Sequence, residues 1–113
     1  MKRRFDAPNQ PSKQAEPSPF ETAVFAAELG GEVPTVDLHG VTVDDIDHEL
    51  GAFIYALHPA GTEALKIVHG RGTQKLRNAV HAWLKAHPDI VAYYRDAESP
   101  SQQGGVTYVA LQK

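Results

Sequence analysis

Two short segments of the chain carry the residue types that acid–base chemistry on a phosphate ester needs. The first places Asp37 and His39 two residues apart, and the second opens with His69 and reaches Arg71. Imidazoles exchange protons near neutral pH, so one histidine can accept a proton while the other donates one. A carboxylate can hold an imidazole in one tautomer, and a guanidinium matches the oxygens of a phosphate. In the candidate catalytic set, Asp37 orients an imidazole, His39 and His69 act as general acid and base, and Arg71 stabilises phosphate charge.

Two glycines and a predicted helix start beside Arg71 favour a phosphate-binding loop. Gly70 and Gly72 let the backbone approach a ligand closely, and the N–H groups at the start of a helix attract an anion. The helix is predicted to begin near Thr73, and its first turns are basic. The candidate phosphate-binding residues are Gly70, Gly72, Thr73, Lys75 and Arg77.

The same residues also suit a second kind of site. Asp37, His39 and His69 supply the two histidines and one carboxylate of a transition-metal site, although the sequence offers no further ligand. We therefore expect that no cofactor is required, with a divalent metal ion as the alternative. The other histidines are expected at helix surfaces or ends, outside the site: His48, His58, His81 and His87.

Hydrophobic patterning places both segments at the ends of strands. Strands are predicted over residues 35–38, 63–68, 90–95 and 106–111, and helices over 42–57 and 73–87. This order predicts an α/β fold, a two-layer βαβαββ sandwich with a mixed four-stranded sheet. In right-handed βαβ units the carboxyl ends of neighbouring strands lie side by side, so the two segments converge at one edge of the sheet. Thr42 is the predicted N-cap of the first of these helices, paired with Asp45 in a capping box.

Composition divides the chain into three parts. Residues 1–19 hold four of the eight prolines and little to bury, which is typical of a disordered tail. This tail carries a charge of +2 and is either a solubilising extension or a basic arm that touches phosphates or a larger partner. Residues 20–33 are predicted to form a short helix and a linker that pack on the main domain, residues 34–113.

Overall composition excludes several classes of protein. A length of 113 residues allows one domain, and 42% hydrophobic with 22% charged residues is ordinary globular composition. The absence of cysteine removes disulfide scaffolds, cysteine-ligated zinc and thiol nucleophiles. No apolar stretch reaches the roughly 18–20 residues that a membrane span needs, and prolines stand where a signal peptide would be apolar. We therefore expect a cytoplasmic protein with no membrane partner.

The net charge of −3 conceals a segregation of charge that permits a nucleic-acid partner. The predicted helix over residues 42–57 carries no Lys or Arg, and its acidic residues are Asp44, Asp45, Asp47 and Glu49. Residues 64–88 carry no Asp or Glu, and their basic residues are Lys66, Arg71, Lys75, Arg77 and Lys85. A polyanion can bind on this basic side despite the negative total.

The motifs together resemble those of the Smr (small MutS-related) domain. Val36-Asp37-Leu38-His39-Gly40 precedes Ile67-Val68-His69-Gly70-Arg71-Gly72-Thr73, which runs into Leu76-Arg77, and Gly104-Gly105 precedes a final apolar strand. The resemblance covers residues 34–113. It implies a stand-alone bacterial Smr domain protein, with a fold similar to the C-terminal domain of a bacterial translation initiation factor. It also implies a nicking DNA endonuclease or an RNA endonuclease, which in some members acts on messenger RNA at stalled, collided ribosomes.

Carried over by position, the resemblance assigns function to the residues already singled out. These are Asp37 and His39 in the first motif, and His69, Gly70, Arg71 and Gly72 in the second. The third motif departs from the family pattern. Many members read Gly-Gly-x-Gly-Ala-Thr where this chain has Gly104-Gly105-Val106-Thr107-Tyr108, so no substrate contact is assigned to this loop.

Three functions follow from these expectations. The first is a Smr-type endonuclease that nicks or cleaves DNA or RNA by histidine acid–base chemistry. The second is a non-catalytic nucleic-acid- or ribosome-binding module, which needs the basic face but not the histidines. A small-molecule phosphohydrolase is disfavoured because no deep apolar pocket is implied. Nothing in the sequence reads a base or a 2′-hydroxyl, so the choice between DNA and RNA stays open, as does the oligomeric state.

Overall fold

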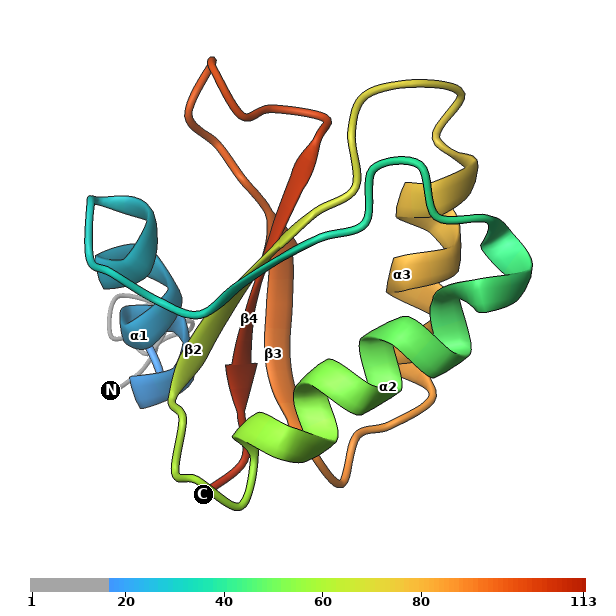
Figure 1. Ribbon diagram of the computed structural model, residues 1–113. Helices are drawn as coiled ribbons and strands as arrows, with labels where there is room; N and C mark the ends of the chain where they lie inside the picture. Colours follow the sequence, from blue (N-terminus) through green and yellow to red (C-terminus); the bar gives the residue numbers. More distant parts are fainter. Residues whose placement is uncertain (1–16) are drawn as a thin grey trace, which may run out of the picture.

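The computed structural model describes residues 17–113, and residues 1–16 of the predicted tail lie outside the described part. Four strands form one mixed sheet in the order β1-β2-β4-β3 (Figure 1): β1 (Thr35–Asp37), β2 (Ala64–Val68), β4 (Val106–Leu111) and β3 (Val91–Asp96). β1 runs parallel to β2, and β4 runs antiparallel to β2 and β3. The ends of β1, β2 and β3 therefore share one edge with the start of β4. This carboxyl edge lies at the top of Figure 1.

Two helices cover one face of the sheet. α2 (Ile46–Leu57) and α3 (Lys75–Lys85) bury the apolar stripes that their 3.6-residue periodicity predicts. From α2 the buried stripe includes Leu50 and Ile54, and from α3 it includes Val80 and Leu84. They meet side chains from alternate positions of the sheet: Leu65, Ile67, Val109 and Leu111. The predicted α/β class, element order and mixed four-stranded sheet are confirmed.

A third helix, α1 (Pro19–Glu28), covers the opposite face (Figure 1). Its Val24 and Ala27 pack against the other set of alternate positions: Ala64, Val106, Tyr108 and Ala110. Since both faces are covered, every residue of β4 is buried, and its sequence shows no apolar–polar alternation. The domain over residues 34–113 thus has two layers, and α1 adds a third.

The helix starts differ from the predicted ones because of local hydrogen bonding. α1 begins one residue earlier than predicted, where the Ser18 hydroxyl accepts the Glu21 N–H at 3.1 Å and completes a capping box. Before α2, residues Val43–Asp45 form a 3-10 turn, so the α-helix begins only at Ile46. Thr42 is the N-cap residue of this turn, but its hydroxyl donates to the Asp45 carboxylate at 3.0 Å instead of accepting a backbone N–H, so the predicted capping box does not form.

The third helix start and the third strand end also shift by a short distance. α3 begins at Lys75 rather than near Thr73, because Gln74 takes a left-handed backbone conformation with φ of 72°. β3 extends to Asp96, one residue beyond the predicted end, which places a carboxylate at the carboxyl edge. No helix among residues 17–113 is long and apolar enough to cross a membrane.

Candidate functional site

The loops after β1 and β2 meet at the carboxyl edge, as the parallel pairing of their strands requires. The Leu38 N–H donates to the Val68 carbonyl at 2.7 Å, which continues the pairing one residue beyond β1. The exposed His39 then lies beside Gly70, where an added Cβ would come within 3.5 Å of His39 Cδ2. The predicted convergence of the two segments is therefore present in the fold.

Asp37 supports the turn that carries His39. Its Oδ1 accepts the backbone N–H of His39 at 2.9 Å, and the side chain is exposed. In the described structure this carboxylate contacts backbone rather than an imidazole. The parallel register explains why it cannot orient His69. Asp37 pairs with Val68, which packs on the α1 face, and His69, one residue further, points to the opposite face.

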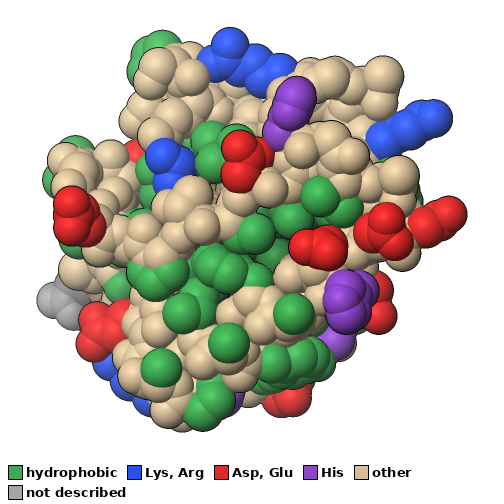
Figure 2. All heavy atoms as spheres, viewed as in Figure 1, with side chains coloured by type: hydrophobic (Ala, Val, Ile, Leu, Met, Phe, Trp, Pro, Cys, Tyr) green, Lys and Arg blue, Asp and Glu red, His purple; other side chains and the backbone are tan. Residues whose placement is uncertain are grey.

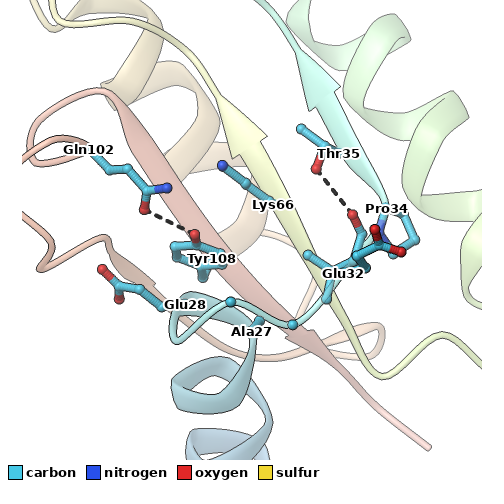
Figure 3. Close-up of a pocket in the computed structure, with 11 residues that line it drawn as sticks. Ala27, Glu28, Glu32, Pro34, Thr35, Lys66, Gln102 and Tyr108 are labelled. Atoms are coloured by element: carbon cyan, nitrogen blue, oxygen red, sulfur yellow. Dashed lines mark hydrogen bonds between the residues drawn. The ribbon is translucent and has the colours of Figure 1, made fainter.

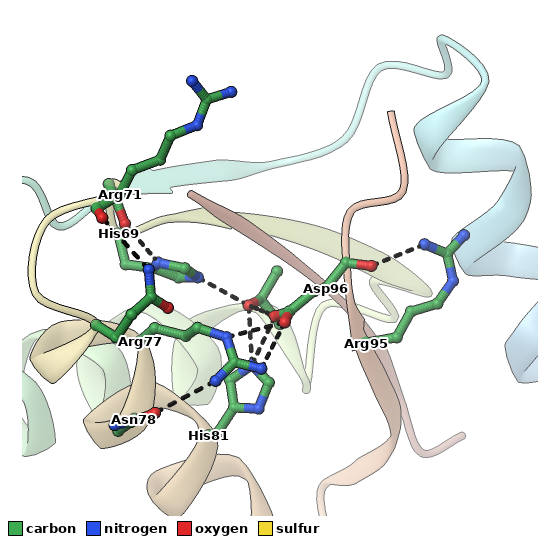
Figure 4. Close-up of polar contacts among 10 residues, drawn as sticks. His69, Arg71, Arg77, Asn78, His81, Arg95 and Asp96 are labelled. Atoms are coloured by element: carbon green, nitrogen blue, oxygen red, sulfur yellow. Dashed lines mark hydrogen bonds and ion pairs between the residues drawn. The ribbon is translucent and has the colours of Figure 1, made fainter. Parts of the chain in front are cut away.

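His69 is buried, with 3% of its surface exposed, and both ring nitrogens are engaged (Figure 4). Nδ1 lies 3.1 Å from the Gly70 carbonyl, and Nε2 lies 2.9 Å from Oγ1 of Thr107. Thr107, with 0% exposed, lies in turn 3.1 Å from Oδ1 of Asp96. In this structure His69 therefore has no free ring nitrogen, and its predicted role as a general acid or base stays a prediction.

The hydrogen-bond partners of His69 constrain where its protons lie. The Gly70 carbonyl only accepts and favours a proton on Nδ1, whereas the Thr107 hydroxyl donates its single proton to Asp96 and leaves Nε2 facing an acceptor oxygen. Burial lowers the pKa of His69, outweighing the carbonyl of Gly70 and the charge of Asp96, which both raise it. A neutral ring is thus favoured at pH 7. Protonation of His69 would let Nδ1 donate to the Gly70 carbonyl and Nε2 donate to the Thr107 oxygen at the same time.

Asp96 joins two side chains of α3 to this network. Its Oδ2 accepts from Arg77 Nε at 2.8 Å and Nη2 at 2.6 Å, and its Oδ1 lies 2.8 Å from His81 Nε2. Burial raises the pKa of Asp96, but the hydrogen bonds from Arg77, Thr107 and His81 outweigh it and lower the pKa below its usual value. Arg77 therefore pairs with a half-buried carboxylate, and its predicted contact with phosphate stays a prediction. Figure 4 shows dashed lines from the Asp96 carboxylate to both Arg77 and His81.

Sequence reasoning missed three members of this network: His81, Thr107 and Asp96. Arg77 and His81 are four residues apart, which places them on one helix face, and this spacing was the available local signal. Thr107 is the polar residue within an otherwise apolar strand. Asp96 could be linked to either only through the β3–β4 register, where it pairs with Thr107.

Arg71 is exposed but holds a distant loop. Its Nε donates to the Gln103 carbonyl at 2.9 Å, and its Nη2 donates to Ser101 at 2.7 Å and Pro100 at 3.3 Å. The side chain points away from the His69 network (Figure 4). Because these bonds occupy Nε and both protons of Nη2, only Nη1 is left for a phosphate oxygen. The two-point contact predicted for Arg71 therefore requires this loop to move.

The loop over residues 97–105 contributes to the site, although its motif was assigned no role. The Gly105 carbonyl accepts the N–H groups of His69 at 2.9 Å and Gly70 at 3.0 Å. A Cβ at Gly105 would lie 3.2 Å from Arg71 Cγ, so a larger residue would push Arg71 away. The loop thus fixes both the histidine and the arginine of the second motif.

Glu28 of α1 anchors the other side of the same loop. Its Oε2 accepts the N–H of Glu98 at 2.7 Å, the N–H of Ser99 at 2.7 Å and the Ser99 hydroxyl at 2.8 Å. Its Oε1 pairs with Arg95 at 2.6 Å, and 7% of the side chain is exposed. Burial raises the pKa of Glu28, but these hydrogen bonds outweigh it and lower the pKa to about 2.

The remaining predicted residues lie in or just after the loop that follows β2. Gly72 and Thr73 are exposed, and Lys75 is the exposed first residue of α3. The side-chain amide of Gln74 donates to the Arg71 carbonyl at 3.3 Å and separates this loop from the helix start. Thr73 therefore precedes the helix instead of beginning it.

The metal alternative and the other histidines can be placed as well. Within residues 17–113, no group of three or more His, Asp or Glu side chains is arranged to hold a metal ion, so Asp37, His39 and His69 do not form the alternative site. His58 bonds to the Gln112 carbonyl at 3.1 Å, and His87 stacks on Trp83 at 3.8 Å between ring centroids. His48 is exposed on α2. His81 is the exception to the predicted ordinary roles.

The basic side predicted from the sequence is divided in the structure. Lys66 lies on the α1 face of the sheet, and Lys85 lies in the last turn of α3, at the end away from the carboxyl edge. Arg71 and Lys75 are the exposed cations of the loop after β2 and the start of α3. Figure 2 shows Lys and Arg side chains along the upper rim and acidic side chains over the start of α2. The acidic residues there are Asp44, Asp45, Asp47 and Glu49.

The chain is similar to known proteins in three comparisons: with a family model, with the sequences of relatives and with solved structures. Residues 36–112 match the family model of the Smr domain. The chain is 39% identical over 88 residues to Endonuclease MutS2 of Solidesulfovibrio magneticus, covering 76% of this chain and 11% of that protein. It is 30% identical over 70 residues to the Ribosome rescue factor SmrB of Buchnera aphidicola, covering 60% of this chain and 40% of that protein. The chain thus spans between a tenth and two fifths of these relatives.

Two solved structures share the fold. The Smr domain of Thermus thermophilus MutS2 matches with a TM-score of 0.67 and 32% identity, over 72% of this chain and 100% of that chain. YdaL, a stand-alone small MutS-related protein from Escherichia coli, matches with a TM-score of 0.68 and 26% identity, over 81% of this chain and 76% of that chain. The arrangement of sheet and helices around the carboxyl edge is therefore shared with solved proteins.

Proposed function

The chain belongs to the Smr domain family, and from that membership we propose that it is an endonuclease that cleaves phosphodiester bonds at the carboxyl edge of its sheet. The observation that carries this proposal is the meeting of two loops, which leaves His39 exposed beside Gly70, the residue that precedes Arg71. Relatives named as an endonuclease and as a ribosome rescue factor support a function on nucleic acid. The substrate is DNA or RNA, including RNA on the ribosome, in the cytoplasm.

The exposed groups divide the chemistry between them. Phosphodiester cleavage removes a proton from the attacking oxygen and delivers one to the leaving oxygen. His39 is the exposed imidazole at the edge and performs one of these transfers, while the exposed carboxylate of Asp37 or water serves the other. Nη1 of Arg71 and the amine of Lys75 bind phosphate oxygens. His69 acts as a positioning residue, because it is buried and holds Gly70 beside His39.

Cleavage assays with a matched histidine control test this proposal. Purified full-length protein is incubated with supercoiled plasmid and with structured RNA, each with and without a chelator. The proposal requires no metal ion, so cleavage should persist in chelator. His39→Ala should reduce cleavage at least about 100-fold, the usual contribution of an acid–base group. His48→Ala removes an exposed histidine on α2 and should cleave like the wild type. Equal activity of both variants would overturn the assignment.

A non-catalytic binding module is the second candidate, favoured by the burial of His69. With both nitrogens of His69 engaged, a single exposed imidazole remains at the edge, where the sequence predicted an acid and a base. In this case the protein would bind DNA or RNA in a salt-dependent way and cleave neither. Binding that survives His39→Ala, together with no cleavage by the wild type, would establish this alternative.

A further inference from the structure

An open-sided cavity of about 610 Å³ lies on the α1 face of the sheet, opposite the His69 network (Figure 3). Its walls are the connection between α1 and β1, the middle of β2 and the start of β4. The side chains that matter most are Thr35, Lys66, Gln102 and Tyr108. Nothing in the acid–base chemistry at the carboxyl edge uses this cavity.

Strand register connects the cavity to the carboxyl edge. Thr35 pairs with Lys66, and Lys66 pairs with Tyr108, so the three form one row across β1, β2 and β4. Asp37 stands two residues beyond Thr35 on the same face of β1, a rise of about 6.6 Å. This rise is comparable to the distance between neighbouring phosphates along one strand of a nucleic acid. Gln102 belongs to the loop that holds Arg71, so the cavity also borders the second motif.

Two free donor groups lie at this cavity, the amine of Lys66 and the amide NH₂ of Gln102, whereas the Tyr108 hydroxyl already donates within the protein. Lys66 forms no ion pair with the described residues, and its amine points toward Gln102 and Tyr108 (Figure 3). The Tyr108 hydroxyl donates to Oε1 of Gln102 at 2.9 Å, which leaves the amide NH₂ of Gln102 free to donate elsewhere. The site therefore suits a ligand rich in acceptor oxygens and nitrogens.

The two acidic side chains of the cavity do not cancel this character. Glu28 is occupied by Ser99, Glu98 and Arg95, and 7% of its side chain is exposed. Glu32 lies at the opposite rim beside Pro34, away from the amine of Lys66 (Figure 3). A phosphate placed at Lys66 therefore meets a cation without a competing free carboxylate next to it.

We propose that this cavity binds one nucleotide of a single-stranded nucleic acid whose neighbouring phosphate lies at the carboxyl edge. Lys66 holds the phosphate, and the Gln102 amide donates to an acceptor on the base or sugar. A base enters such a cavity only when it is unstacked, which a single strand allows without cost in base pairing. Tyr108 is 2% exposed and offers no face for stacking. The proposal rests on the proposed function for its orientation toward the carboxyl edge.

Salt-dependent binding of an oligonucleotide tests the role of Lys66. An eight-nucleotide single strand is titrated in the His39→Ala background, which keeps the strand intact, and binding is followed by fluorescence anisotropy. Lys66→Met keeps the aliphatic stem and should weaken binding about 3- to 10-fold, and it should flatten the plot of log affinity against log salt by about 0.7. Lys85→Met makes the same charge change at the far end of α3 and should keep the parent slope.

A second variant tests the donor group of the cavity. Gln102→Glu still accepts the Tyr108 hydroxyl proton but replaces the free NH₂ with a carboxylate oxygen. We expect a loss of affinity of about 5-fold or more, since a donor to the nucleotide becomes an acceptor of like charge. Thermal melting of each variant confirms that the domain stays folded.

The outcomes separate this proposal from the proposed nuclease activity. If Lys66→Met binds and titrates with salt like Lys85→Met, the cavity is not a nucleotide site, even when His39→Ala abolishes cleavage. Tighter binding of duplex than of single strand also overturns it. If Lys66→Met shows the expected weaker binding and flatter salt plot while the wild type cleaves no substrate, the nucleotide site stands and the nuclease proposal fails.

Discussion

His39 and His69 follow neighbouring parallel strands, yet His39 is exposed and His69 is buried, with 3% of its surface exposed. The difference comes from one residue of register. His69 is the first residue after β2 and continues its alternation toward the α2–α3 face, where Thr107 and Asp96 receive it. His39 is the second residue after β1 and stands in a turn held by Asp37. Histidines in similar motifs therefore have different surroundings, one within a buried hydrogen-bond network and one open to solvent.

The largest expected effect is the difference in stability between the two variants that each lack one imidazole. His69→Ala leaves the Thr107 hydroxyl and the Gly70 carbonyl without their partner and opens a space in a buried site, so we expect a loss of about 3 kcal/mol in the free energy of unfolding. His39→Ala removes an exposed ring and should cost less than about 0.5 kcal/mol. Urea unfolding of both variants measures the contrast. Equal losses would remove the distinction between the two histidines.

Glu28→Gln tests whether the loop over residues 97–105, which holds Arg71, depends on its anchor in α1. The variant weakens four contacts to Arg95, Glu98 and Ser99, and we expect a loss of about 2 kcal/mol at pH 7. The pKa of Glu28 is lowered from 4.5 to about 2, so its contribution is complete above about pH 4.5 and is lost as pH falls toward 2. Glu21→Ala, which alters an exposed carboxylate of the same helix, should lose only its cap contribution of about 0.5 kcal/mol. Acid titration of stability by circular dichroism checks both expectations, and an unchanged acid limb in Glu28→Gln would contradict them.

Thr107→Val tests the hydroxyl that connects His69 to Asp96. The substitution keeps the shape but removes a buried hydrogen-bonding group from both neighbours, with an expected loss of about 1.5 kcal/mol. Thr73→Val changes an exposed threonine in the loop after β2 and should leave stability within about 0.5 kcal/mol of the wild type. Chemical unfolding of the pair gives the comparison, and a neutral Thr107→Val would show that the hydroxyl does not link the network.

The smallest expected effect is a pH dependence near neutrality. Burial lowers the pKa of His69 from 6.5, so the unfolded chain takes up this proton more readily than the folded protein. Stability from a neutral His69 is therefore complete above about pH 6.5 and falls as pH drops below it. The difference in unfolding free energy between pH 7.5 and 5.5 should be smaller in His69→Gln than in the wild type, by under about 1 kcal/mol. The same pH dependence in both proteins would place the titration elsewhere.

The sequence allowed the convergence of the two motifs to be predicted, because parallel pairing follows from the order of elements alone. The directions of the side chains were harder to predict. Asp37 and His39 share one side only if the strand continues, but β1 ends at Asp37 and its carboxylate bonds to the backbone. Beyond the end of a strand, the alternation of faces no longer fixes the side on which a side chain lies.

The rest of the site depends on contacts between residues distant in the chain. Arg71 bonds to carbonyls about thirty residues away, at Pro100, Ser101 and Gln103, and no local sequence pattern predicts these hydrogen bonds. Asp96 reaches Arg77 and His81 only because β3 and α3 are brought together by the sheet. Composition suggested Arg77 as a free cation, whereas tertiary structure provides it with a carboxylate.

The burial of β4 on both faces bears on where this domain can be cut. The family match begins at residue 36, but α1, which covers half of β4, ends before that point. A fragment trimmed to the match would bare Val106, Tyr108 and Ala110 to water and would also lose Glu28, the anchor of the loop that holds Arg71. Such a fragment would expose a contiguous apolar patch of the kind that drives aggregation. One face of β4 is therefore covered by a helix that lies outside the recognisable motif.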